Sequence, residues 1–419
     1  MPLARIRDID VGAFATAAGG VALLASDQGG FFPHTWPWAA LAFAAVAILI
    51  LAGTTPVRIG RAQIVLIAGL ALLTGWTALS AIWSSEPSTS LDEATRTPIY
   101  TVAALALVAF AARGASAALL LGVAAATTGV AAYSLVDFAV HGVHQSDQQG
   151  GLLEYPLGYA NALGVLCAIG LVVVLVLGIG ERRRARGGFT ALALGAAVVL
   201  AIALARTNSE GSYVAAAAGG GVAIAFAFGR RWASIAAAGV AAALLAVYIL
   251  TAISEPGFMS ARGDYWHVAW IAASHHPLIG DSAGTYDLAW ATYGDVARFG
   301  GVLDAHSLYL EMPAELGIVG LLLTLVLLAP IVAGLRRAPR TPLSAAALGG
   351  AVTFVVHAGL DWDWEMPAVT AAGIVCLAAL SGAARTEPAA SRAWRIAGLG
   401  LAAAAIISYI VFVTVRRVP

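Results

Sequence analysis

The sequence predicts an all-α protein that crosses a membrane many times. Its residues are 60% hydrophobic and only 11% charged, whereas a soluble domain carries about 25% charged residues. The mean hydropathy is +0.86. Apolar runs close to the ~20 residues that span a bilayer recur along the whole chain. Together these observations indicate a polytopic membrane protein.

About thirteen apolar runs are long enough, or nearly so, to be transmembrane helices. They lie near residues 10–27, 36–54, 62–83, 97–112, 115–137, 157–180, 188–206, 210–229, 232–253, 312–335, 343–360, 366–384 and 394–415. The first and fourth runs are short, so we expect about 12 or 13 helices. The chain then divides into N-terminal helices (1–253), a long loop with short helices (254–311) and C-terminal helices (312–419).

The arginines predict the orientation of these helices. All 23 basic residues are arginine, and the absence of lysine excludes Schiff-base and P-loop chemistry. With the N-terminus inside, 17 of them fall in predicted cytoplasmic segments, as the positive-inside rule requires. These segments include the stretches around Arg5 and Arg58 and the run 181–187, whereas Arg416 and Arg417 are exceptions.

Charge and cysteine content exclude several classes of protein. The formal net charge is zero, which argues against a nucleic-acid partner. Cys167 and Cys376 lie inside apolar runs, so a disulfide framework or a zinc site is not expected. The N-terminus lacks a small-residue cleavage site, and we interpret the first apolar run as a retained helix rather than a signal peptide.

Polar side chains collect on the predicted outer side. Most carboxylates and histidines fall in or beside outer segments at 84–96, 138–156, 207–209, 254–311 and 361–365. The predicted inner loops are short and basic, with nothing suited to a nucleotide. We therefore expect any chemistry to face outward.

The stretch 261–280 predicts an amphipathic helix outside the membrane. Arg262, Trp266 and Trp270 recur at i, i+4 and i+8, so they share one helical face. Tryptophans anchor helices at membrane interfaces, which would leave Arg262 on a lipid phosphate. The alternative, that Arg262 binds an anionic ligand, has about equal weight.

The stretch "DAHSLYLEMPAELGIVG" at 304–320 carries the strongest catalytic candidate. His306 has an ordinary pKa near 6.5 and suits general-base work, and Asp304 could orient it. Glu311 and Glu315 are i, i+4 at a helix entrance. They could bind a metal, but we favour a helix cap, because negative charge is stabilised at a helix N-terminus.

Three further outer segments carry candidates. Arg206 and Glu210 could pair around a tight turn, or Arg206 could face an anionic ligand through bidentate contacts. Asp361 and Asp363 have no counter-charge nearby in the sequence. Asn161 enters a helix, where helix packing is its simplest role.

These segments resemble the O-antigen ligase and polymerase superfamily. "RGDYWHVAWIAASHHPLIGDSAGTYD" is similar to the family pattern Arg…Trp…His-Pro-Leu-x-Gly-x-Gly…Phe/Tyr, and "DAHSLYLEMPAELGIVG" to Ala-His-Asn-x-Tyr-Leu-x-x-x-x-Glu-x-Gly-x-x-Gly. "SAIWSSEPSTSLDEATR", "YPLGYANALG" and "DWDWEMP" occur in the same order. The chain departs at Ser307, where the family often has Asn, and at Glu210, where it often has Arg.

The resemblance implies a GT-C-like glycosyltransferase in the bacterial cytoplasmic membrane. Such enzymes pass a glycan from undecaprenyl pyrophosphate to an acceptor hydroxyl on the outer face, without a metal, a nucleotide sugar or another cofactor. The family's catalytic histidine matches His306, and Arg262 matches a pyrophosphate contact that Arg206 could supplement. The further candidate substrate contacts are Asp304, Trp266, Tyr309 and Asp361.

The expected partners are a lipid-linked glycan donor, a glycan, lipid or protein acceptor, and membrane lipids. Two alternatives remain open. A polymerase of the same superfamily would join repeat units, and a transporter or flippase would move lipid-linked sugar. A transporter is expected to carry charges at mid-helix or broken helices, whereas most charges of this chain lie at predicted helix ends.

Overall fold

The computed structural model describes residues 10–53, 57, 59–143, 149, 151–182, 187–254, 261–384 and 392–416, and these contain helices and no β-strand. The first ten α-helices are α1 (Val11–Ser26), α2 (Trp36–Ala52), α3 (Arg61–Ser80), α4 (Pro87–Arg96), α5 (Pro98–Ala112), α6 (Ser116–His141), α7 (Ala160–Arg182), α8 (Gly187–Thr207), α9 (Glu210–Ala227) and α10 (Arg231–Ser254). They are followed by α11 (Ala261–His275), α12 (Tyr286–Tyr293), α13 (Val296–Phe299), α14 (Leu308–Leu325), α15 (Ala329–Arg337), α16 (Pro342–His357), α17 (Pro367–Ala383) and α18 (Arg392–Arg416). Short 3-10 turns are η2 (Gln28–Gly30), η3 (Val326–Leu328) and η4 (Asp363–Glu365).

The predicted fold class is confirmed. In the described part of the chain, eight helical segments are long and apolar enough to cross a membrane, and four shorter apolar helices accompany them. Each of the thirteen predicted runs coincides with a helix. The run at 210–229, now α9, is the one that belongs to neither group.

The segment at 84–96 is mostly helix rather than the predicted loop. Residues 87–96 form α4, which continues into α5 as one 26-residue segment. The sequence PSTSLDEATR is polar, so hydropathy alone did not reveal it. Pro87 and Pro98 both stand at the first position of a helix, where the missing N–H costs nothing.

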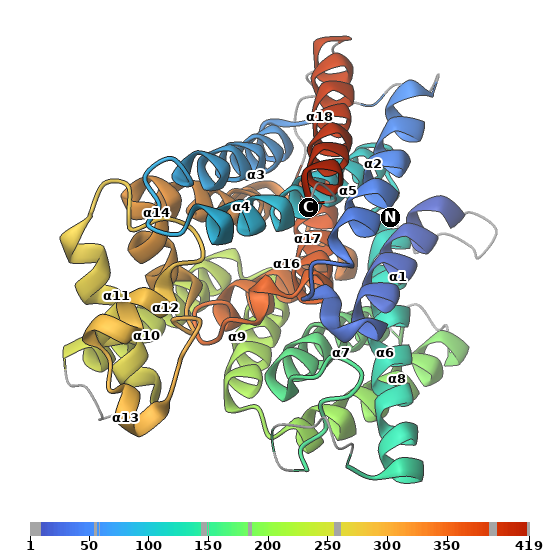
Figure 1. Cartoon of the computed structure of the whole chain (residues 1–419). Coiled ribbons are helices and arrows are strands. Elements are labelled where there is room, and N and C mark those ends of the chain that lie inside the picture. The colour runs from blue at the N-terminus through green and yellow to red at the C-terminus, as the bar shows by residue number, and fades with distance from the viewer. Residues whose placement is uncertain are drawn as a thin grey trace.

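The core consists of α5, α16 and α17, which the other helices surround (Figure 1). Every residue of α5 is buried, and α16 and α17 are buried almost throughout. Their small side chains let neighbouring backbones approach closely. A Cβ on Gly219 of α9, for example, would lie 2.4 Å from the carbonyl oxygen of Gly349 in α16.

Helix α14 is broken at Gly317, and the loop after α11 fits into the break. Gly317 has φ +64 and ψ −167, a conformation that essentially requires glycine. Ile318 N–H donates to the Pro277 carbonyl at 2.9 Å, and Asp281 N–H donates to the Ala314 carbonyl at 3.0 Å. The backbone groups freed by the break therefore find partners in the loop at 277–282.

Several predicted inner segments lie together, which agrees with one common face. Arg231 donates to the backbone carbonyls of Arg336 and Ala338. Arg113 and Arg395 both donate to carbonyls at the C-terminal end of α2, where cations are favoured. Other basic residues of the orientation argument lie outside the described residues: Arg5, Arg7, Arg58, Arg183, Arg184, Arg186, Arg385 and Arg417.

Candidate active site

Asp361, just before η4, is the centre of a buried polar cluster. Its carboxylate accepts hydrogen bonds from Arg262 at 2.5 Å, Asn161 at 2.6 Å and Tyr159 at 2.8 Å. The residue is 1% exposed. The counter-charge that the local sequence lacked therefore comes from α11, and Asn161 joins the cluster rather than serving helix packing alone.

Arg262 and Asp361 each stabilise the ionised form of the other. Burial alone would raise the pKa of Asp361, but Arg262 and two histidines outweigh it and the pKa lies below its usual range. Burial likewise disfavours the cation of Arg262, and Asp361 outweighs that and raises its pKa. Only one guanidinium nitrogen of Arg262 bonds Asp361, and 28% of the side chain is exposed. The remaining N–H groups can face an anion.

His306 lies in the loop before α14, and one of its ring nitrogens forms a hydrogen bond to the backbone. Its Nδ1 is 3.0 Å from the carbonyl oxygen of Asp304. A carbonyl only accepts, so Nδ1 carries the hydrogen and Nε2 of the neutral ring keeps a lone pair. Burial lowers the pKa of His306 against the opposing effect of Asp361. The predicted orienting role of Asp304 thus belongs to its backbone.

Aromatic side chains fix the His306 loop in place. The rings of Tyr265 and Trp362 lie 5.1 Å and 6.5 Å from the imidazole. The Trp266 indole donates to the His306 carbonyl at 3.3 Å. His306 itself has φ +55, which is uncommon for a residue other than glycine.

The expectation of a lipid-anchored face on α11 is wrong for Trp266. That side chain is fully buried and packs edge-on against Tyr248, whereas Trp270 is 52% exposed. The reason is that α11 packs between α10 and α14 instead of lying alone on the membrane. Trp266 therefore contacts the loop that carries His306, and a direct contact with substrate stays a prediction.

The two glutamates of α14 have separate roles. Glu311 accepts from the Ala305 N–H at 2.8 Å. Glu315 accepts from the N–H groups of Gly284 and Tyr286 at 2.9 and 3.0 Å, and Tyr286 is the first residue of α12. The predicted cap thus belongs to α12 rather than to α14.

A carboxylate cluster lies next to His306. Asp304, Glu311 and Glu365 each bring one carboxylate oxygen within 4.8 Å of the others. Burial, followed by repulsion from Glu365, raises the pKa of Asp304 well above its usual range. The neutral form of Asp304 is therefore favoured, because like charges in one site disfavour ionisation.

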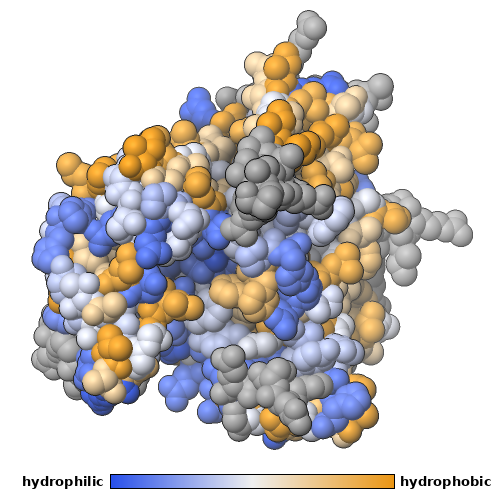
Figure 2. Space-filling model, in the orientation of Figure 1, coloured by the Kyte–Doolittle hydropathy of each residue, from blue (hydrophilic) through white to orange (hydrophobic). Residues whose placement is uncertain are grey.

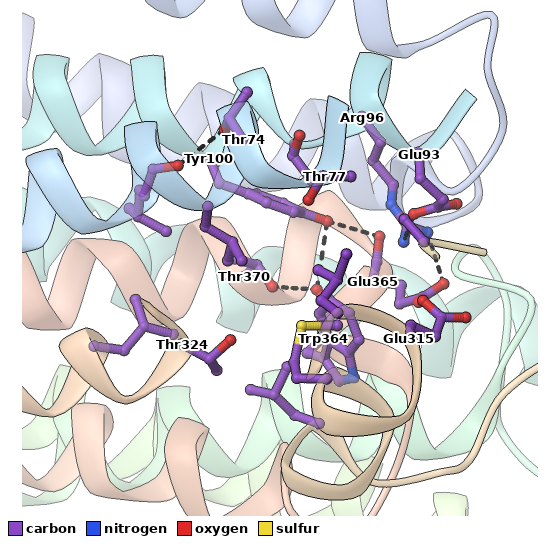
Figure 3. A pocket seen from close by; sticks show the side chains of 18 of the residues that line it. Thr74, Thr77, Glu93, Arg96, Tyr100, Glu315, Thr324, Trp364, Glu365 and Thr370 are labelled. Carbon is purple, nitrogen blue, oxygen red and sulfur yellow. Dashed lines mark hydrogen bonds and ion pairs between the residues drawn. The ribbon is translucent and has the colours of Figure 1, made fainter. Parts of the chain in front are cut away.

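A buried ion-pair triad borders this cluster (Figure 3). Arg96 of α4 donates to Glu365 at 2.6 Å and also to Glu93, and Arg96 is 3% exposed. These three side chains and Glu315 line a cavity of about 60 Å³, with Thr74, Thr77 and Trp364 among the other walls. The cavity holds a few water molecules at most, and His306 is not among its walls.

A second histidine was missed by the sequence. His357, at the end of α16, is 3.2 Å from Asp363 through Nδ1 and 3.1 Å from the Ser212 hydroxyl through Nε2. All three side chains are at most 1% exposed. The arrangement joins the end of α16 to the starts of α9 and η4.

Two further predicted contacts, Arg206 and Tyr309, form no hydrogen bond to Asp361 among the described residues. Arg206 is exposed, and its guanidinium stacks on Phe138 at 4.7 Å. No ion pair joins it to Glu210 in the described chain, so the predicted Arg206–Glu210 pair is absent. The Tyr309 hydroxyl donates to the Val355 carbonyl at 2.7 Å. Contacts of Arg206 and Tyr309 with substrate stay predictions.

One comparison with known families is informative. Residues 195–325 match the family model Wzy_C, described as O-antigen ligase. The matched segment runs from α8 into α14 and includes Arg206, Arg262, Asp304 and His306, while Asp361 follows it. No curated protein matches the chain.

Proposed function

We propose that this member of the O-antigen ligase superfamily transfers a glycan from undecaprenyl pyrophosphate to an acceptor hydroxyl. The family suggests a membrane ligase or polymerase and a glycosyltransferase-like enzyme. The observation that carries the proposal is His306, whose Nε2 accepts no hydrogen bond from the residues that the structure describes and whose charge is affected by both members of the Arg262–Asp361 pair. A base and an anion-binding group are the two parts that this reaction needs.

Two different residues act on the proton and on the leaving group in this mechanism. Nε2 of His306 takes the proton of the attacking hydroxyl. The oxygen of that hydroxyl forms a bond to the sugar C1 while the bond from C1 to the pyrophosphate oxygen breaks. Arg262 stabilises the negative charge that develops on the pyrophosphate. A single displacement of this kind inverts the anomeric centre.

Asp361 positions Arg262 for this task. A flexible arginine loses side-chain entropy when it binds an anion, and a carboxylate partner that already holds one nitrogen reduces that loss. Asn161 and Tyr159 hold the carboxylate in turn. The cluster is thus preorganised before the donor binds.

The reaction centre faces the outside of the cytoplasmic membrane in this proposal. The arginine distribution supports the orientation, and the clustering of Arg231 with the loop after α15 supports a common inner face. The donor chain then reaches the site from the bilayer, and the acceptor arrives from the aqueous side.

The deciding experiment measures glycan transfer by purified protein with EDTA present. Undecaprenyl-pyrophosphate-linked oligosaccharide is the donor, and wild type is compared with His306→Ala and Arg262→Ala. We expect released undecaprenyl pyrophosphate from wild type and a loss of at least about 100-fold in His306→Ala. Turnover that survives His306→Ala would remove the base from the mechanism.

The product separates ligase from polymerase. A ligase moves the glycan to a different acceptor, whereas a polymerase lengthens the lipid-linked glycan itself. Either product satisfies the proposal, and the fold favours neither.

The transporter alternative has one supporting observation, the break in α14. Broken helices of transporters present free backbone groups to their substrate. In this chain the loop at 277–282 occupies those groups instead, which favours an enzyme. Binding of the lipid-linked glycan without any consumption would reverse this preference.

A further inference from the structure

A groove of about 310 Å³ lies where α7 and α9 end and α16 begins. Each of these three helices packs against the other two. Ile179 of α7 and Ile224 of α9 belong to its apolar walls, and Arg340 is the one charged residue among the described residues that line it. The groove therefore combines an apolar surface with a single cation.

The apolar walls are open to the surroundings of the molecule. Ile179 and Ile224 are 52% and 49% exposed. Figure 2 shows hydrophobic side chains spread across one face of the molecule, as expected for a chain that lies in lipid. In a bilayer such side chains contact the hydrocarbon of lipids, because removing apolar surface from water is favourable.

The groove is shorter than a lipid chain. Its walls lie within residues 176–180 of α7 and 224–228 at the end of α9, which is about 7.5 Å of each helix at 1.5 Å per residue. The hydrocarbon of one leaflet is about 15 Å thick. Because both stretches stand at helix ends, the groove takes the part of an acyl chain that is nearest to the head group.

Arg340 is exposed and lies beside the end of α9. A Cβ on Gly229 would be 3.4 Å from the Nη1 atom of Arg340. Arginine can bond the last carbonyls of a helix, but the N–H groups of Gly229 and Arg230 already donate to carbonyls of α9. Within the described chain, the Arg340 guanidinium forms no hydrogen bond and no ion pair. Its five N–H donors can therefore bind a ligand.

Hydrogen bonds fix the loop that carries Arg340. Arg231, the first residue of α10, donates to the carbonyl oxygens of Arg336 and Ala338. On the other side of Arg340, the Thr341 hydroxyl accepts a backbone N–H of α16 at 3.2 Å. A side chain that extends from a fixed loop loses less conformational entropy when it binds a ligand.

The surroundings of the groove are strongly basic. Residues 224–231 and 336–343 contain five arginines and no carboxylate, and after Gly180 the sequence continues with ERRRAR, which adds four arginines and one glutamate. Basic clusters at a membrane border attract anionic lipids. Guanidinium groups also bind phosphate through two parallel hydrogen bonds. The charge of this region thus complements an anionic head group.

We propose that this groove binds an anionic phospholipid, with the phosphate on Arg340 and the first part of one acyl chain against Ile179 and Ile224. A zwitterionic phospholipid has the same phosphate and chains, but its ammonium group would lie among arginines, with no carboxylate in 224–231 or 336–343 to receive it. A soluble phosphate ion would make no use of the apolar walls. The inference does not depend on the proposed function.

The first test measures the binding of single lipids to the full chain in detergent by native mass spectrometry. Phosphatidylglycerol and phosphatidylcholine are the probes, added separately. We expect wild type to prefer phosphatidylglycerol, and Arg340→Gln to bind it about fivefold more weakly. The preference for phosphatidylglycerol over phosphatidylcholine should shrink in the same variant.

Arg61→Gln is the matched control for charge. Arg61 is exposed at the start of α3, on the same predicted inner side. It does not line the groove, so the variant should bind phosphatidylglycerol as wild type does. Equal affinities of Arg340→Gln and wild type, or an equal loss in Arg61→Gln, would overturn the proposal.

Thermal unfolding separates a ligand contact from a structural one. Without lipid, Arg340→Gln and wild type should have the same Tm, because no described contact of the guanidinium is lost. A ligand that binds the folded chain raises Tm, so phosphatidylglycerol should raise the Tm of wild type more than that of Arg340→Gln. A lower lipid-free Tm in Arg340→Gln alone would make Arg340 a structural residue and count against the site.

The second test identifies the lipid in the groove. Ile224→p-benzoylphenylalanine places a photoreactive group on its wall, and Leu194 of α8, 57% exposed, is the control position. The full chain is illuminated in nanodiscs that contain equal amounts of phosphatidylglycerol and phosphatidylcholine. We expect adducts enriched in phosphatidylglycerol at position 224, adducts that follow the lipid mixture at position 194, and no enrichment at 224 when Arg340→Gln is added. The same adduct ratio at both positions would overturn the proposal.

Discussion

His306 presents a single nitrogen for chemistry, because its Nδ1 is held by the Asp304 carbonyl. Burial lowers the pKa of the ring below 6.5, so the neutral base dominates at pH 7. As a base, His306 must be unprotonated, and the rate falls only when the pH drops through its pKa. We expect kcat/KM to be flat around pH 7 and to decline with a midpoint below 6.5. A midpoint above 7 would contradict this assignment.

Asp361→Asn tests what the Asp361 carboxylate contributes to the same site. The carboxylate raises the pKa of His306, so its removal should move the acid midpoint to a still lower pH. Loss of the charged partner of Arg262 should also reduce transfer about tenfold, because a charge-assisted hydrogen bond contributes about 1.5–3 kcal/mol. Asp287→Asn is the control, since within the described residues that side chain accepts a hydrogen bond from the next backbone N–H alone. A reduced rate with an unmoved pH profile would show that Asp361 acts through Arg262 alone and has no effect on His306, and an unchanged rate would contradict its positioning role.

At the scale of single residues, the sequence predicted which residues belong to the candidate site better than it predicted their contacts. His306, Arg262 and Asp361 were singled out from local patterns, but the contact between Arg262 and Asp361 joins positions 99 apart. Nothing local shows that Asp304 acts through its backbone. His357 ends the apolar helix α16 and was missed because its partners, Ser212 and Asp363, come from other helix ends.

At the scale of elements, the break in α14 depends on one glycine. Gly317→Ala would force an alanine into a glycine-only conformation, and its Cβ would lie 2.3 Å from the Leu278 carbonyl. We expect a loss of at least about 1–3 kcal/mol in stability and a lower Tm in detergent. Gly221→Ala is the control, because it meets nothing within 4 Å and should be neutral or slightly stabilising. Equal Tm values for the two variants would show that the break can relax.

Hydropathy predicted helices well because apolar runs and membrane helices have the same length. It failed for α4, whose polar sequence reads as an outer loop although the helix is continuous with α5. It also could not show that α14 is interrupted, since "ELGIVG" looks like any apolar stretch. The interruption requires the loop at 277–282, which lies about 40 residues earlier in the chain.

At the scale of the whole molecule, Arg96 joins the N-terminal helices to the turn that carries Glu365 and Asp361. Arg96→Met would leave the buried Glu365 and the partly buried Glu93 without a counter-charge, which costs about 3–5 kcal/mol. We expect a marked fall in Tm. The triple variant Arg96→Met, Glu93→Gln, Glu365→Gln should recover much of it, because no charge is then left unpaired. Failure of the triple variant to recover would assign the loss to packing of the arginine stem.

The orientation of the whole chain can be measured with cysteines. Both native cysteines, Cys167 and Cys376, are buried, so their background reaction should be low. Ala297→Cys lies on the predicted outer loop and Pro339→Cys between α15 and α16, and both positions are exposed. A membrane-impermeant maleimide added to intact cells should label position 297, and position 339 only after lysis. The reverse pattern would place His306 on the cytoplasmic face, and the proposed transfer on the outer face of the membrane would then have to be abandoned.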